Sequence, residues 1–276
     1  MYREGKPEGF FYLEHRTVDS KCNIVTDVHV TPGNVNDVEP YIERLDRQIK
    51  RFGFDVKYVG LDAGYLTNLI CKQIIQRNLQ GVIGFRLGPH EKNKYTKYKF
   101  QYVKEWDVYV CPNMFFLRYR TTDKNGYKSY SSVPKDCANC SHKELCLIGK
   151  NNNRTIRRHV WEEFKENVVR FTRSDKGKTI YKRRKETVER SFADAKELHG
   201  LRYCRMRGKA KVSEQCLLTA AVQNMKKIAM VLFSHGFQYF MKIGSIYCQL
   251  YRIQLAINKL SIKITITQIG NSGLCQ

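Results

Sequence analysis

The spacing of apolar residues predicts a hairpin and then a helix at the start of the chain. Residues 10–18 and 24–30 are rich in β-branched and aromatic side chains and are separated by the polar run DSKCN, a pattern typical of two antiparallel strands joined by a turn. The run TPGNVND ends the second strand and offers Asp37 as a helix N-cap. Helical spacing follows, with an expected buried face of Tyr41, Leu45, Ile49 and Phe52.

A strand, a helix and a second strand come next, within about thirty residues, which is the size of a βαβ unit with parallel strands. Residues 56–61 form a short apolar run, as expected for a strand buried on both faces. This run leads into Asp62, and Thr67 can cap the following helix. The second strand is GVIGFR, and the helix between has an expected buried side of Leu69, Ile70, Ile74 and Ile75.

Beyond residue 86 the predicted secondary structure changes twice, first to short strands and loops and then back to helices. Residues 87–153 are rich in Tyr, Lys, Asn and Gly and are interpreted as an insertion of short strands and loops. Helices are expected again from Trp161, with two clear ones over residues 186–199 and 213–233. The tail beyond Gly236 fits either helix or strand. The helix over 213–233 has an apolar stripe expected in the core, formed by Leu218, Val222, Met225, Ala229 and Leu232.

The charge balance points to a polyanionic partner. The chain has 49 Lys and Arg against 26 Asp and Glu, a formal net charge of +23, which favours nucleic acid. Residues 150–211 contain 20 Lys and Arg against 8 Asp and Glu, a net +12. No export signal, lipidation motif or apolar run long enough for a bilayer is evident, so a cytosolic protein is expected. Four aromatic residues could stack on bases or pack internally: Trp106, Tyr109, Tyr119 and Tyr127.

Two carboxylates occupy positions that suit metal binding. Asp62 follows a parallel strand, and ligand crevices in α/β sheets lie at the carboxyl ends of such strands. Glu189 lies in the most basic part of the chain, with Lys196 two helical turns later. Each position also has a structural interpretation. Asp62 fits a loop residue that caps the next turn, and the helix of Glu189 fits a solvated helix with an Arg190–Asp194 ion pair.

Taken together, the ordered elements resemble the DDE transposases of bacterial insertion sequences, over about residues 8–233. The stretches that carry the resemblance are YLEHRTVDSKCNIVTDVHVTPGNVNDVEPY (12–41), VGLDAGY (59–65), VERSFADAKELHGLRYCRMRG (188–208) and AVQNMKKIA (221–229). The resemblance implies an α/β fold: an RNase H-like mixed sheet flanked by helices, with a Cys-containing insertion before the last catalytic helix. We therefore expect a first DDE part at 1–86, the insertion at 87–155, a helical DDE part at 156–235 and a tail at 236–276.

The resemblance also implies the chemistry, which is DNA strand cleavage and transfer during transposition, a form of DNA recombination carried out by mobile elements. Asp62 would be the second acid of the catalytic triad and Glu189 the third, with Lys196 as a further catalytic residue. The acids would hold two Mg²⁺ or Mn²⁺ ions about 4 Å apart. The partners would be double-stranded DNA at transposon ends and target, and a second copy in a synapse, in the bacterial cytoplasm at the nucleoid. The DNA-binding residues would be Arg183, Arg184, Lys185, Arg190, Arg202, Arg205 and Arg207.

One element that the resemblance implies is missing from this sequence. A first catalytic Asp should lie on a strand before the hairpin, yet no Asp precedes Asp19. That strand would lie between the hairpin and the strand ending in Asp62, so its loss exposes two sheet edges. We therefore expect a chain that is inactive and marginally folded by itself, from a truncated copy or a split reading frame.

Two other functions are compatible with the same residues. The first is a non-catalytic, basic DNA-binding remnant of a transposase, with or without a structural zinc module. The second is another RNase H-like nuclease such as a resolvase, against which the long insertion and the run VERSFADAK argue. His15 and Arg16 lie in the hairpin and would contact phosphate if the hairpin flanks the site.

Four of the ten cysteines are candidates for a zinc site. Cys137 and Cys140 have the spacing of a metal knuckle, Cys146 follows, and Cys111 lies upstream. Four thiolates can close a tetrahedral Zn²⁺ site, and His142 could replace one of them. The alternative is a set of reduced cysteines in a small packed module. The other cysteines, at 22, 71, 204, 216, 248 and 275, are expected to behave as small apolar residues.

Overall fold

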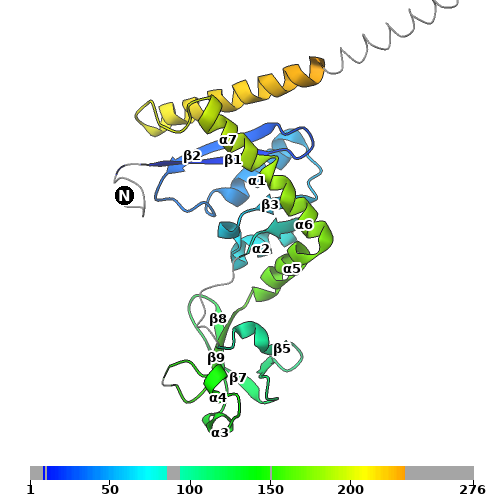
Figure 1. The fold of residues 1–276 in the computed structure, drawn as a ribbon, viewed down its shortest axis with the longest axis vertical. Coiled ribbons are helices and arrows are strands. Elements are labelled where there is room, and N and C mark those ends of the chain that lie inside the picture. Colours follow the sequence, from blue (N-terminus) through cyan, green and yellow to red (C-terminus); the bar gives the residue numbers. More distant parts are fainter. Residues whose placement is uncertain (1–8, 10, 86–93, 150, 234–276) are drawn as a thin grey trace, which may run out of the picture.

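The computed structural model describes residues 9, 11–85, 94–149 and 151–233, and it has the α/β architecture expected. The elements are spread along the long axis of the molecule, and the chain runs from the hairpin to the insertion and back (Figure 1). The helix Lys209–Phe233 and α7 (Val188–Leu198) lie at one end, and the cysteine-containing insertion lies at the other. The predicted tail from residue 236 on lies outside the described residues.

The predicted hairpin is confirmed. Strand β1 (Tyr12–Val18) pairs antiparallel with β2 (Val25–Pro32), with a register shift between Thr17 and Val18. The turn is fixed by Asp19, whose Oδ2 accepts the backbone N–H of Cys22 at 2.6 Å. A side chain that bonds to backbone groups two or three residues ahead is a turn device that Asp supplies well.

Helix α1 (Tyr41–Phe52) confirms the predicted helix but begins later than expected. Asp37 is not its N-cap, because residues 37–40 form a turn and Pro40 occupies the cap position without a side-chain bond. Asp37 instead lies 3.6 Å from the ring of His15. Tyr41 and Leu45 are buried as predicted, whereas Phe52 is exposed at the helix end.

The predicted βαβ unit is confirmed. Strand β3 (Tyr58–Leu61) runs parallel to β4 (Gln80–Ile83), and α2 (Asn68–Gln76) connects them. Thr67 caps α2 by accepting the N–H of Ile70 at 3.2 Å. A short 3-10 helix, Ala63–Tyr65, follows β3.

The burial of this unit differs from the prediction in two places. Strand β3 is not buried on both faces, because Val59 packs into the core while Tyr58 and Gly60 remain exposed. Leu69 is exposed as well, and Cys71 takes its place beside Ile70 and Ile74 in the core. One face of the β3–β4 pair therefore packs against α1 and α2, and the other is only partly covered.

The two strand pairs stay separate. Among the described residues no strand bonds to the second edge of β1 or of β3, so they do not form one mixed sheet. Helix α1 connects them, because Tyr41 and Leu45 share a core with Val59 and Ile70. From the same helix Arg44 donates to the carbonyl oxygen of His15 at 3.0 Å. The strand that the resemblance places between the pairs is thus not found in the described part of the chain.

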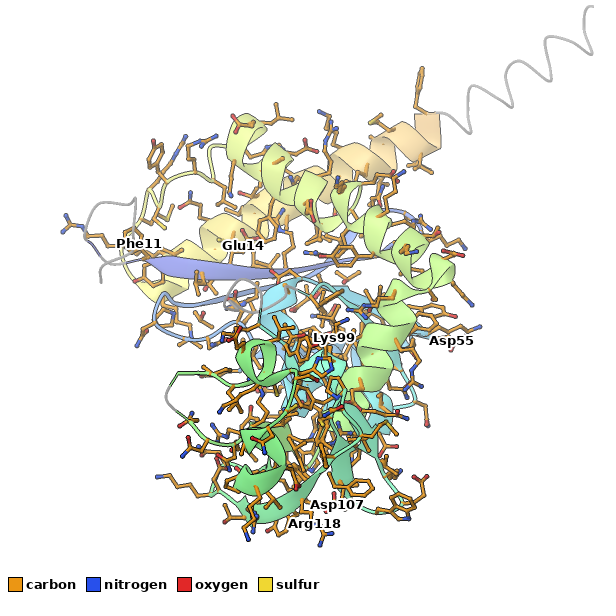
Figure 2. All side chains as sticks on the ribbon, turned by 60° about the horizontal axis from the view of Figure 1, so that its bottom comes forward. Phe11, Glu14, Asp55, Lys99, Asp107 and Arg118 are labelled. Atoms are coloured by element: carbon orange, nitrogen blue, oxygen red, sulfur yellow. The ribbon has the colours of Figure 1, made fainter. Side chains whose placement is uncertain are left out.

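The predicted short strands of the insertion are confirmed, and they form one sheet. The insertion contains a five-stranded antiparallel sheet in chain order, made by β5 (Gln101–Val103), β6 (Val108–Val110), β7 (Phe116–Thr122), β8 (Tyr127–Ser131) and β9 (Thr155–His159). A 3-10 helix, Lys97–Lys99, precedes it, and two short helices, α3 (Pro134–Ala138) and α4 (Lys143–Cys146), lie between β8 and β9. Asp107 and Arg118 of this part lie at the opposite end of the molecule from Glu14 of the hairpin (Figure 2).

Two helices lead from the insertion back toward the βαβ unit. Helix α5 (Glu162–Arg173) packs on β4 and α2, and α6 (Asp175–Lys182) continues into a 3-10 turn, Arg183–Lys185, before α7. Ser174 caps α6 by accepting the N–H of Gly177 at 3.2 Å. The turn between α5 and α6 is tight, because a Cβ on Gly177 would lie 2.0 Å from the carbonyl oxygen of Phe171.

The helix Lys209–Phe233 buries a different face from the one predicted. The expected core stripe is exposed, with Leu218 at 65% relative exposure, while Val212, Cys216 and Gln223 on the opposite side are buried. The buried side is chosen by the hairpin, since Val212 and Cys216 pack against Val30.

The helix Lys209–Phe233 also bears on whether the chain contains a membrane-spanning segment. Contrary to the sequence-based expectation, the helix Lys209–Phe233 is long and apolar enough to cross a membrane by length and composition. One such helix is weak evidence for a membrane protein, because core helices of soluble proteins pass the same test.

Candidate active site

Asp62 and Glu189 line the same open cleft, which has a volume of about 530 Å³. Asp62 comes from the carboxyl end of β3 and Glu189 from the first turn of α7. The cleft is therefore built by segments that are far apart in the sequence. Its other lining residues are Ala63, Gly84, Phe85, Thr172, Tyr181 and Arg184.

Asp62 is held by its own backbone. Its Oδ1 accepts the N–H of Gly64 at 2.9 Å and so caps the 3-10 turn after β3. This is the capping role that the sequence allowed as an alternative. The bond occupies one carboxylate oxygen, and the other oxygen remains available to a ligand because a carboxylate has about four acceptor positions.

Glu189 is paired with an arginine. Its carboxylate is half exposed, at 50%, and lies 3.6 Å from Nη1 of Arg184. The Arg184 side chain is only 15% exposed, donates to the hydroxyl of Tyr181 at 3.1 Å, and packs along Gly60. Its buried Nε has no hydrogen-bond partner in the described structure. A desolvated guanidinium thus stands at the wall of the cleft, next to one of the two acids.

The negative charge of Asp62 also acts on a neighbouring tyrosine. Burial raises the pKa of Tyr65 to about 12, and the negative charges of Asp37 and Asp62 add to this effect. Even so, no group of three or more His, Cys, Asp or Glu side chains is arranged as a metal site in the described residues. The described structure therefore supplies two acids to the cleft.

A buried polar network fixes the helix that carries Glu189. Arg16 of β1 donates to the hydroxyl of Ser191 on α7 at 2.8 Å and to Gln223 of the helix Lys209–Phe233 at 2.8 Å. Arg16 also pairs with Glu14 at 2.5 Å. Burial raises the pKa of Glu14, although the positive charge of Arg16 opposes that shift.

This network corrects the expectation for the hairpin residues. His15 is 4% exposed and Arg16 8%, so neither side chain is free to contact phosphate. His15 Nε2 is bonded to the hydroxyl of Thr31 at 2.7 Å. The two residues serve the packing of the hairpin against α1 and α7.

The structure places the two lysines expected near the acids outside the cleft. Lys196 is exposed and does not line the cleft, and its charge acts on Glu14 of the hairpin. Lys185 is exposed on the turn before α7. Of the basic residues predicted to bind DNA, Arg184 lines the cleft.

The other predicted DNA-binding arginines lie on the surface around α7. Arg183 donates to the carbonyl oxygen of Ser20 at 2.6 Å, which connects the turn before α7 to the hairpin. Arg190 pairs with Asp194 at 3.0 Å, as the helical spacing predicted. Arg202 pairs with Glu197, and Arg205 and Arg207 are exposed on the turn that follows.

The four aromatic candidates divide by exposure. Trp106 and Tyr119 are exposed, and Tyr127 is partly buried against the ring of His159, with centroids 4.9 Å apart. Tyr109 lies in the core of the insertion sheet. Base stacking is therefore open to Trp106 and Tyr119 and excluded for Tyr109.

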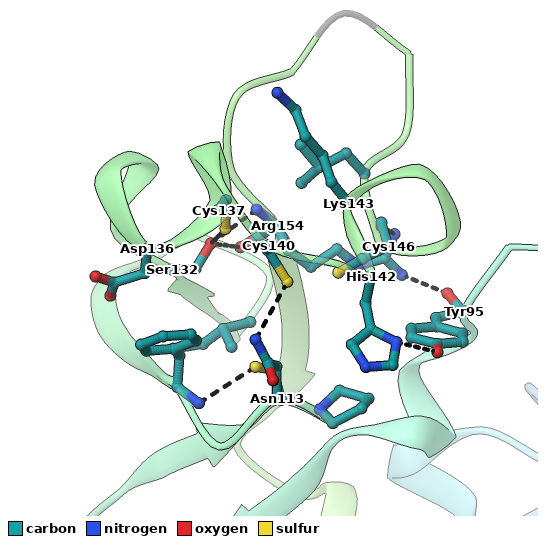
Figure 3. A pocket seen from close by; sticks show the side chains of 15 residues that line it. Tyr95, Asn113, Ser132, Asp136, Cys137, Cys140, His142, Lys143, Cys146 and Arg154 are labelled. Atoms are coloured by element: carbon teal, nitrogen blue, oxygen red, sulfur yellow. Dashed lines mark hydrogen bonds between the residues drawn. The ribbon is translucent and has the colours of Figure 1, made fainter.

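The four candidate zinc ligands converge on one pocket (Figure 3). Cys111, Cys137, Cys140 and Cys146 all line it, and His142 does so as well. Burial raises the pKa of Cys146, an effect that the positive charge of Arg154 opposes.

The other cysteines confirm the prediction only in part. Cys71 and Cys216 are buried, as small apolar residues are expected to be, but Cys22 and Cys204 are exposed. The cysteines at 248 and 275 lie outside the described residues.

Five residues that line the cleft were not singled out from the sequence: Ala63, Gly84, Phe85, Thr172 and Tyr181. Gly84 follows β4 just as Asp62 follows β3, so the rule that placed ligands at the ends of parallel strands also applied to it. A Cβ on Gly84 would lie 2.3 Å from the Tyr181 hydroxyl. Tyr181 and Thr172 come from α6 and α5, and no local pattern distinguished them from ordinary helix residues.

Comparison with known families supports the resemblance drawn from the sequence. Residues 110–229 match the family model of the transposase DDE domain. The matched part contains Glu189 and the four pocket cysteines, and Asp62 lies before it. No curated protein and no solved structure matches the chain. The chain is thus similar to DDE transposases, and the similarity implies a DNA-acting protein of an enzyme family that uses divalent metal ions.

Proposed function

We propose that the cleft between Asp62 and Glu189 is the metal-binding part of a DNA strand-cleavage and transfer site of an insertion-sequence transposase. One observation carries the proposal: two carboxylates from segments far apart in the sequence line one open cleft, together with a largely buried arginine. The match of residues 110–229 to the transposase DDE domain supports the same function.

The donor set fits a hard divalent cation. Mg²⁺ is commonly held by one or two carboxylates together with substrate phosphates, and it keeps several of its waters. Asp62 and Glu189 supply oxygen ligands of this kind in a cleft wide enough for hydrated ions and a phosphate. When bound, Mg²⁺ or Mn²⁺ would activate a water or a 3′-hydroxyl and stabilise the leaving oxygen.

The chain's own residues would position the DNA. Arg184 can exchange its contact with Glu189 for a phosphate, because a guanidinium binds carboxylate and phosphate with the same geometry. Arg202, Arg205 and Arg207 extend the basic surface beyond α7 and would contact the backbone of double-stranded DNA without reading its sequence. A homodimeric synapse at the nucleoid belongs to the proposal through the resemblance to transposases.

A nicking assay tests the catalytic function. Purified chain is incubated with supercoiled plasmid and Mg²⁺ or Mn²⁺, and the variants Asp62→Asn and Glu189→Gln are compared with it. Asp55→Asn is a matched control, because Asp55 is an exposed acid just before β3 that does not line the cleft and, in the described part of the chain, pairs with Lys57 at 3.4 Å. Metal-dependent nicking that both cleft variants abolish and the control retains would support the proposal, and it would contradict the expectation that the chain is inactive by itself.

A second candidate function is DNA binding without catalysis, by a remnant of a transposase. The observation in its favour is that the described residues bring two acids into the cleft and no third. This candidate expects DNA binding that weakens steeply with salt, with no nicking in either metal. Nicking by the wild type that persists in both cleft variants would contradict both candidates.

A further inference from the structure

We propose that Cys111, Cys137, Cys140 and Cys146 bind one structural Zn²⁺ ion, and that Arg154 is the counter-charge of this centre. The site lies in the insertion, at the far end of the molecule from the helix Lys209–Phe233. It is independent of the Asp62–Glu189 cleft and uses none of its residues.

The first observation is convergence. Cys111 precedes the turn between β6 and β7, Cys137 and Cys140 belong to α3 and the turn after it, and Cys146 ends α4. All four line one cavity of about 20 Å³, which is room for a single water or ion. Figure 3 shows Cys137, Cys140 and Cys146 grouped around this cavity.

The second observation is a buried cation without an anion. Arg154 is 8% exposed and lines the same pocket. Its guanidinium donates to two carbonyl oxygens, those of Cys146 at 3.0 Å and Tyr95 at 2.9 Å, and it lies against the ring of Phe100. Its Nε has no partner, and none of the ion pairs found in the described residues includes it.

This arrangement is costly unless negative charge lies nearby, because a buried cation without a counter-ion loses its hydration and gains no ion pair. Four thiolates around one Zn²⁺ carry a net charge of minus two. Such a centre would supply the charge that Arg154 lacks. Reduced, neutral thiols would not, and this difference favours the metal centre over simple packing of the cysteines.

The third observation is a set of donors already placed at the sulfur atoms. The backbone N–H of Phe115 donates to Cys111 Sγ at 3.3 Å, and the amide of Asn113 donates to Cys140 Sγ at 3.5 Å. The hydroxyl of Ser132 lies 3.2 Å from Cys137 Sγ. Hydrogen bonds from a second layer of residues orient metal ligands and tune their basicity.

Metal binding requires the thiols to turn. In the described structure the sulfur atoms face these separate donors, and no three metal-ligating side chains are placed as a site. The proposal requires that rotation of the cysteine side chains brings the sulfurs to the usual Zn–S distance of about 2.3 Å. His142 is a poorer ligand than the four thiols, because its Nδ1 is bonded to the Tyr95 hydroxyl at 2.7 Å.

The centre would stabilise a part of the chain that has little else to hold it. Helices α3 and α4 have five and four residues, and isolated helices of that length are not stable in water. Four ligands without an open position are typical of structural rather than catalytic zinc.

Metal analysis of the purified full chain tests the proposal. The expected result is about one zinc per chain by mass spectrometry of the metal. Co²⁺ substitution should give the intense visible bands of tetrahedral thiolate-bound cobalt. Cys140→Ser should lose both, and Cys204→Ser, which removes an exposed cysteine outside the pocket, should keep both. A wild type that holds no zinc after reconstitution and shows no cobalt bands would overturn the proposal.

A second measurement covers the case in which Cys140→Ser does not fold. Wild-type chain is alkylated with and without a chelator, and each cysteine is followed by mass spectrometry. The four pocket cysteines should be protected together and released together by the chelator, while Cys22 reacts in both conditions. Equal labelling of the four with and without chelator would contradict the metal site.

The role of Arg154 has its own test. Arg154→Met should weaken zinc affinity about 10- to 100-fold, as loss of a supporting residue around a metal does. Arg154→Lys keeps the charge and should restore most of the affinity. Equal affinities of the wild type and Arg154→Met, measured by competition with a chelator, would remove Arg154 from the proposal.

Discussion

The Nη1 atom of Arg184 lies 3.6 Å from the Oε1 atom of Glu189, at the wall of the cleft that also contains Asp62. The guanidinium occupies space next to the carboxylate that a divalent cation would also use. Positive charge from the protein and from the metal therefore compete for Glu189. This competition leads to the first prediction.

Replacing Arg184 by Gln should raise the affinity of the cleft for Mn²⁺. The ion pair is partly exposed, and such pairs contribute about 0.2–1 kcal/mol, so the gain should be about 1.4- to fivefold. Mn²⁺ titration followed by electron paramagnetic resonance measures it. Arg190→Gln is the matched control, because Arg190 pairs with Asp194 on the same helix and should leave the affinity unchanged. Weaker Mn²⁺ binding in Arg184→Gln would show that Arg184 supports the site rather than competing in it.

Gly177→Ala should destabilise the chain strongly. The new Cβ would lie 2.0 Å from the Phe171 carbonyl oxygen, and backbone atoms cannot move aside as a flexible side chain can. We expect a loss of about 1–3 kcal/mol in the free energy of unfolding, measured by urea denaturation. Gly60→Ala serves as control, since its Cβ would meet only the Arg184 side chain at an ordinary 3.5 Å.

Arg16→Met should cost more than the loss of a surface ion pair. The substitution leaves Glu14 buried without its partner and removes the bonds to Ser191 and Gln223. Breaking one side of a buried pair costs about 3–5 kcal/mol, and urea denaturation should show a loss of this order. The exposed pair of Arg190 is again the comparison, with an expected change below about 0.5 kcal/mol. Similar losses in the two variants would mean that the Arg16 network contributes little to stability.

The free energy of unfolding should fall as the pH is lowered through the histidine range. Burial and the nearby charge of Arg44 lower the pKa of His15, and burial lowers that of His29. A group with a lowered folded-state pKa contributes stability above its usual pKa and loses it as the pH falls. Each histidine can change the free energy by at most about 1.4 kcal/mol per pH unit.

The comparison is urea unfolding at about pH 7.5 and about pH 5.5, in the wild type and in His15→Gln/His29→Gln. The double variant should show a flatter dependence. The raised pKa of Glu14 has the opposite sign, since its contribution to stability is lost as the pH rises through its folded-state pKa, so the double variant isolates the part due to the histidines. A wild-type stability that is constant between the two pH values would contradict the assignment to the histidines.

The local elements, and two acids that line the cleft, could be predicted from the sequence. Three signals depend only on neighbouring residues and could therefore be predicted. They are the β-branched and aromatic composition of the hairpin, the apolar run before Asp62 and the helical spacing around Glu189. The rule that ligands bind at the carboxyl ends of parallel strands then selected Asp62 correctly as a cleft residue.

Contacts between side chains from distant segments could not be predicted from the sequence and are seen in the tertiary structure. The apolar stripe of the helix Lys209–Phe233 faces outward because the hairpin packs against its other side. His15 and Arg16 are buried for the same reason, since α1 and α7 cover them. The meeting of Arg184 with Glu189, and of Arg154 with four cysteines, also depends on contacts between distant segments. Residue spacing encodes the period of an element, and its partner is chosen by packing across the whole chain.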